Sequence, residues 1–123
     1  MAQCIAPAIK IAGGAVGGAK GATYNLTVTD MGAYTATTSN TVYNDNVTGG
    51  LGTPYATVKY TIDGSDPKTS QTASTFALDQ TGVGYGAGFS PVTGMIIRAI
   101  AIRDGYTDSA ESRVNLTLKC VAP

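Results

Sequence analysis

The sequence predicts an all-β domain, a sandwich or a barrel. Apolar and polar residues alternate in several short runs, and clusters of Gly, Asn, Asp, Ser and Pro separate these runs. No amphipathic stretch with the helical period is long enough to form a stable helix. At 123 residues the chain holds one hydrophobic core but not two, so we expect a single domain over residues 1–123.

The strand pattern recurs in order along the chain. The segments that carry it are Cys4–Ile11, Thr23–Thr29, Ala56–Ile62, Ser74–Leu78, Met95–Arg103 and Ser112–Lys119. In the last of these we expect Val114, Leu116 and Leu118 to point inward. The glycine-rich runs "GGAVGGAKG" and "GVGYGAG" are predicted to be flexible turns, because glycine weakens a strand.

Met95–Arg103 is the strongest strand because both of its faces are largely apolar. Ile97 and two alanines form one face, and Arg98 shares the other with three isoleucines: Ile96, Ile100 and Ile102. This pattern suits a central strand that is covered on both sides. We expect the second face to be capped by the segment 30–55 or by another subunit.

Residues 30–55 are polar and rich in Gly, Asn and Thr. A loop of this length without structure of its own is unusual in a small domain. We therefore expect an inserted hairpin that turns near Ser39–Asn40, with Tyr34 and Tyr43 as packing residues, or a functional loop.

Charge and hydropathy exclude several function classes. Eight basic and eight acidic residues cancel, so we expect no nucleic-acid partner. No apolar run is long enough to span a membrane, so no membrane insertion is expected. The start "MAQCIAPAIKIAGG" lacks a basic region before its apolar stretch, which predicts a protein kept in a cytoplasm. The alternative is a secreted domain to which the Met was added.

Two spaced motifs, "VKYTIDGSDPKTS" and "SPVTGMIIRAIAIRDGYTDSAESRVNLTL", carry a family likeness. They resemble the immunoglobulin-like domain at the C-terminus of chitobiases and β-hexosaminidases. The matching positions are Tyr60, Thr61, Asp63, Gly64, Ser65, Pro67, Ile97, Ala99, Ala101, Gly105, Tyr106 and Ser109. The resemblance implies an immunoglobulin-like antiparallel β-sandwich with the inserted hairpin, and it implies a non-catalytic module.

The acidic loop Asp63–Pro67 has two interpretations. Gly, Asp, Ser and Pro are the residues that a turn requires, and two carboxylates are also calcium ligands. Calcium takes six or more oxygens, and the EF-hand spacing is absent. We therefore interpret this loop as a structural turn, and we give the same interpretation to Asp104 and Asp108.

The sequence offers little for catalysis. It has no His, so Ser-His and Cys-His pairs are ruled out. Glu111 is its one glutamate. We expect no enzyme, no cofactor and no metal site. Sugar binding is the stronger rival, although the chain has no Trp. Tyrosines predicted in loops would then form the binding surface: Tyr34, Tyr43, Tyr55 and Tyr85.

Cys4 and Cys120 lie near the two ends of the chain. Three states are open for them: free or buried thiols, an intramolecular disulfide, and a disulfide between subunits. An immunoglobulin-like fold that places its termini at opposite poles disfavours the intramolecular bridge.

These observations predict a non-enzymatic structural protein of a large assembly. The first choice is a bacteriophage virion component, a head-decoration or tail accessory protein made in the host cytoplasm. Its partners would be copies of itself or other virion proteins, through Tyr34, Tyr43, Ile96, Ile100 and Ile102. The alternative is an extracellular module of a secreted bacterial protein that binds carbohydrate or a cell surface.

Overall fold

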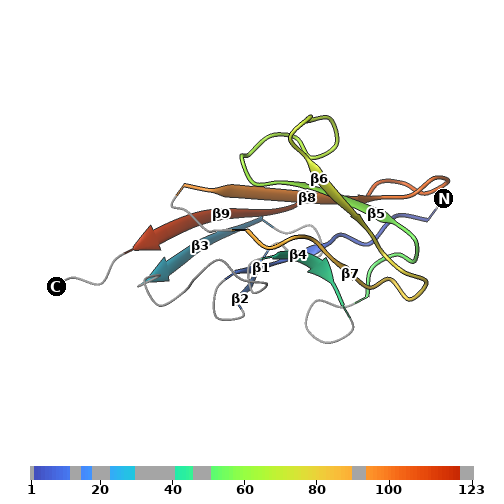
Figure 1. Ribbon diagram of the computed structural model, residues 1–123, viewed down its shortest axis with the longest axis horizontal. Helices are drawn as coiled ribbons and strands as arrows, with labels where there is room; N and C mark the ends of the chain where they lie inside the picture. The colour runs from blue at the N-terminus through green and yellow to red at the C-terminus, as the bar shows by residue number, and fades with distance from the viewer. Residues whose placement is uncertain are drawn as a thin grey trace.

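The computed structural model describes residues 2–11, 15–17, 23–29, 41–45, 51–89 and 94–119. Every regular element in these residues is a β-strand, and the strands form two sheets that pack as a sandwich (Figure 1). Among the described residues, none forms a helix of the length and hydropathy that crossing a membrane requires.

The larger sheet has five strands. Its strands lie in the order β3-β9-β8-β5-β6. In that order they span Thr23–Thr29, Ser112–Lys119, Ile96–Ile102, Thr57–Thr61 and Ser74–Ala77. Neighbouring strands run antiparallel except for β3 and β9, which pair in parallel from Thr23↔Arg113 to Thr29↔Lys119.

The smaller sheet has four strands, which are all antiparallel. Its strands lie in the order β2-β1-β4-β7. In that order they span Ala15–Gly17, Ala8–Ile11, Thr41–Asn44 and Gly84–Tyr85. Together the two sheets make an immunoglobulin-like β-sandwich, the fold class that the sequence predicts.

The predicted strands agree closely with the observed ones. Two are identical at both ends, and the others begin or end within a few residues of the prediction. The first strand begins only at Ala8, because Pro7 before it has no N–H for a ladder hydrogen bond. Strands β2 and β7 were not predicted, since both lie in the glycine-rich runs where backbone pairing leaves no side-chain pattern.

Strand β4 changes the interpretation of residues 30–55. It lies between β1 and β7 in the smaller sheet, so this part of the segment belongs to the sandwich itself and is not an appendage. The turn expected near Ser39–Asn40 lies outside the described residues. Val42 packs in the core cluster with Ile97. Strand β4 therefore covers the inner face of β8, not the outer face that we expected the insertion to cap.

Strand β8 has one buried face and one that is half-buried. Ile97, Ala99 and Ala101 are completely buried, and the residues between them are only partly covered. Among the described residues, β8 has one layer against it, because the sandwich has two layers. Coverage of its outer face by another subunit stays a prediction.

This alternation generates a stability prediction. Ile97→Ala should lower the free energy of unfolding by about 3 kcal/mol, because it leaves a cavity in a fully buried site. The matched variant Ile100→Ala, on the same strand but facing outward, should cost about 1 kcal/mol or less. Urea denaturation of both variants measures the difference, and equal losses would contradict the one-sided burial of β8.

Candidate functional site

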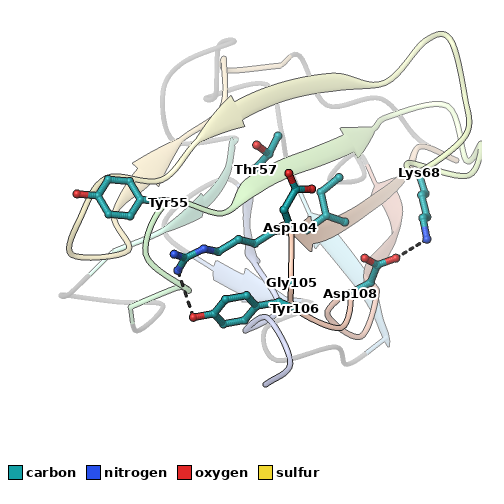
Figure 2. Close-up of a pocket in the computed structure, with 9 residues that line it drawn as sticks. Tyr55, Thr57, Lys68, Asp104, Gly105, Tyr106 and Asp108 are labelled. Carbon is teal, nitrogen blue, oxygen red and sulfur yellow. Dashed lines mark hydrogen bonds and ion pairs between the residues drawn. The ribbon is translucent and has the colours of Figure 1, made fainter. Parts of the chain in front are cut away.

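An open groove of about 700 Å³ lies at one end of the larger sheet. Its lining comes from the turn before β5, the loop after β5, and the connection from β8 to β9 (Figure 2). The residues are Tyr55, Thr57, Lys68, Ile102, Arg103, Asp104, Gly105, Tyr106 and Asp108.

The β8–β9 connection begins with a tight turn. Strand β8 ends at Ile102, whose cross-strand partner is Thr57. The backbone N–H of Tyr106 then donates to the carbonyl oxygen of Arg103 over 3.0 Å. Gly105 at a φ of 81° supplies the left-handed residue that this turn requires. The chain is thereby reversed, and the Tyr106 ring lies 4.6 Å from the Arg103 guanidinium carbon.

A second turn presents Tyr55. The N–H of Ala56 donates to the carbonyl of Thr53 over 3.1 Å, and Pro54 occupies the position after Thr53. Proline fixes a negative φ, and Tyr55 follows it with a φ of 61°. This combination defines a type II turn, whose third residue is usually Gly or Asn. A tyrosine there costs about 1 kcal/mol or more, yet the residue is 63% exposed.

Arg103 connects the two turns. Its Nη1 donates to the carbonyl of Pro54 over 2.8 Å and to the Tyr106 hydroxyl over 3.3 Å. Its guanidinium carbon also lies 5.9 Å from the centre of the Tyr55 ring and 4.6 Å from that of Tyr106. Both distances are within the range of a cation–π contact. The groove is therefore partly preorganised by the protein itself.

The charges of the groove balance. Lys68 and Asp108, which both line the groove, form an ion pair. The hydrogen bond from Lys68 to the Asp108 carboxylate raises the pKa of Lys68. Arg103 is a second cation and Asp104 a second anion. Within the part of the chain that the structure describes, no hydrogen bond or ion pair engages the Asp104 carboxylate (Figure 2). In that view Asp104 lies between Tyr55 and Lys68.

The acidic loop after β5 is a turn whose side chains bond one another. The Asp63 carboxylate accepts from the N–H of Ser65 over 3.1 Å and from the Thr72 hydroxyl over 2.9 Å. The Ser65 hydroxyl also donates to it, and this bond is the main reason why the pKa of Asp63 is lowered. Across the described ranges, no group of three His, Cys, Asp or Glu side chains is placed to hold a metal.

The structure separates the residues predicted to form an interface. Tyr34 lies outside the described residues. Tyr43 is completely buried and stacks on Tyr85 with ring centres 6.0 Å apart. Naming Tyr43 as a surface contact was therefore wrong, because all four residues of β4 are buried. The three predicted interface residues of β8 are half-buried and lie on one face together with Arg98: Ile96, Ile100 and Ile102.

Cys4 is a free and buried cysteine, 4% exposed. Burial raises the pKa of its thiol, and it also counts against a bridge from Cys4 to a neighbouring subunit. The N-terminal segment and the tip of β9 lie at opposite ends of the sandwich (Figure 1). Cys120 lies outside the described residues.

Sequence reasoning found Tyr55 only as one of several loop tyrosines and missed its neighbours in the groove. Arg103 looked like the end of a strand, and Tyr106 looked like part of a turn motif. A usable signal was present in Thr53-Pro54-Tyr55-Ala56. That pattern predicts a turn, but a type I turn would accommodate it without a positive φ, so the backbone strain at Tyr55 could be found only from the structure.

Comparisons with known proteins give one family. A model of the family described as "Fn3 associated" matches residues 51–113, just over half of the 123-residue chain. The chain belongs to the Fn3-associated family. All the lining residues of the groove fall inside the Fn3-associated match. No curated protein matches the chain, and no solved structure does.

The Asp63 hydrogen bonds generate a prediction about pH. Because the folded-state pKa of Asp63 is below its usual value, its contribution to stability is present at neutral pH and is lost as the pH falls below about 4. Ser65→Ala removes the main cause, so the Asp63 pKa should rise toward its usual value. Carboxyl ¹³C NMR titration of both proteins tests this, and an unchanged Asp63 pKa would refute the assignment.

Proposed function

We propose that the chain is a non-enzymatic structural module of a large assembly, and that it acts through contacts of its surface. The setting that we favour is a bacteriophage particle, on which it would be a head-decoration or tail accessory protein. An extracellular assembly is the alternative setting. The partners would be further copies of the chain or other proteins of the particle.

The observation that carries this proposal is the outer face of β8. Its outward residues are Arg98 and three isoleucines, Ile96, Ile100 and Ile102, and no described element packs over them. Lys59 is the cross-strand partner of Ile100, and Arg113 is the partner of Arg98. We call these six residues the outer β8 face. Isoleucines surrounded by long charged side chains are typical of an interface with an apolar centre and a polar rim.

The charge of this face suggests what it contacts. Lys59, Arg98 and Arg113 are positive, and Glu111, which accepts two hydrogen bonds from Arg98, is the nearby carboxylate. The same face of a second copy would carry the same excess of positive charge and would be repelled. A different, more acidic surface therefore suits it better, on another copy or on another protein of the particle.

A charge at the centre of the outer β8 face tests the proposal. The wild-type chain should form a defined oligomer or polymer in light scattering, and Ile100→Asp should reduce it to a folded monomer. The matched variant Thr117→Asp, exposed on β9, should leave the mass unchanged. A wild-type monomer would contradict self-assembly. An unfolded Ile100→Asp variant would mean that this face is part of the core.

A second function, binding of carbohydrate or of a cell surface, is favoured by one specific observation. The groove of about 700 Å³ holds an exposed tyrosine, a second tyrosine and the Asp104 carboxylate, which accepts no hydrogen bond from the described residues. The resemblance of "VKYTIDGSDPKTS" to the immunoglobulin-like domain of chitobiases and β-hexosaminidases supports the same proposal, since those enzymes act on glycans.

A further inference from the structure

We infer that the groove is a binding site for a neutral sugar ring at the end or along the length of an oligosaccharide. The ring would stack on Tyr55, and its hydroxyls would bond the Asp104 carboxylate. This inference rests on the second of the two functions proposed above and deepens it, and it does not require the chain to assemble through the outer β8 face.

The conformation of Tyr55 indicates that its ring has a use beyond folding. The turn position prefers Gly or Asn, and the tyrosine holds it at a φ of 61°. The ring gains little from the protein in return, since it is 63% exposed and its contact with Arg103 is the longer of the two cation–π distances. Strained residues that folding does not require are concentrated at binding sites.

The charges select a neutral ligand. Lys68 is paired with Asp108, and Arg103 is engaged by Pro54 and Tyr106. Arg103 keeps its positive charge, but the lining also holds Asp104, so the two cations of the groove are matched by two carboxylates and there is no excess of positive charge to attract a phosphate, a sulfate or an acidic peptide. Within the described ranges the Asp104 carboxylate has no partner, and it repels anions and can accept hydrogen bonds through two oxygens. Neighbouring hydroxyls on a sugar ring are the donors that suit such an acceptor.

The volume and the lining residues of the groove favour a sugar over a lipid as its ligand. Ile102 is the one aliphatic side chain among the lining residues, and the others are aromatic, charged or hydroxyl-bearing apart from Gly105. A volume of about 700 Å³ is sufficient for one or two rings. The flat face of a pyranose is apolar and its edge is polar, and a tyrosine beside a carboxylate complements both parts.

Titration of the 123-residue protein with neutral disaccharides tests this inference. Maltose, cellobiose, lactose and N,N′-diacetylchitobiose would be added separately and followed by ¹H–¹⁵N NMR shifts. We expect at least one to bind with a Kd of about 1 mM, because an open groove covers only part of a ligand. The shifts should be concentrated at Tyr55, Asp104 and Tyr106.

The decisive variant is Tyr55→Asn. Asparagine tolerates the positive φ, so the unfolding temperature should stay the same or rise while the affinity falls roughly tenfold. Asp104→Asn, in an exposed turn, should also weaken binding and provides a second variant. The control Leu51→Asn removes a large side chain that is also exposed, at 46%, but that does not line the groove, and it should leave the affinity unchanged.

Each outcome decides the inference. Loss of affinity in Tyr55→Asn and Asp104→Asn but not in Leu51→Asn supports it. Absence of binding at tenfold above the expected Kd, or binding that both groove variants retain, overturns it. Tighter binding of sialyllactose than of lactose would overturn the neutral-ligand assignment. Light scattering of the same samples separates the two proposals, because a monomer that binds a disaccharide contradicts self-assembly but not the sugar site, and an oligomer that binds none contradicts only the sugar site.

Discussion

Strand β8 is hydrogen-bonded along both edges, to β5 and β9, and its inward residues Ala99 and Ala101 are fully buried. A close-packed interior leaves no space beside an alanine, so the larger side chains of the smaller sheet must fill in around it. The end of β8 is fixed by buried Ser109, whose hydroxyl accepts from the N–H of Ala101 over 2.9 Å while its own N–H donates to the Ala101 carbonyl. The connection from Arg103 to Asp108 is thereby fixed to the sheet at both of its ends. The groove residues on this connection are held in place by the same hydrogen bonds.

The sequence predicts those parts of the fold in which side chains alternate. Strand β9 and the inward face of β8 were correct because burial imposes a period of two on the residues themselves. The smaller sheet was harder to predict, since β2 and β7 consist of glycine-rich backbone and β4 lies in a polar segment. Its residues Thr41 and Asn44 are buried although they are polar. The groove could not be predicted because residues 55, 68 and 103 come together only through the register of β5 and β8.

The two proposed surfaces belong to the same sheet and meet at one residue. Ile102 lies on the outer β8 face and also lines the groove. A protein partner seated over the isoleucines would therefore approach the mouth of the groove. Assembly and ligand binding would then influence each other through direct contact, with no change of shape in the sandwich.

The parallel pairing of β3 with β9 has a mechanical consequence. The two strands run in the same direction and are held by a continuous register from Thr23↔Arg113 to Thr29↔Lys119. A force that pulls β3 from its beginning and β9 from its end acts along the strands in opposite directions. Such a force shears all of these backbone hydrogen bonds together, whereas a force across a hairpin separates its bonds one after another. The β3–β9 pair therefore resists a force applied along the strands at these two points better than a hairpin of the same length resists a force across its open end.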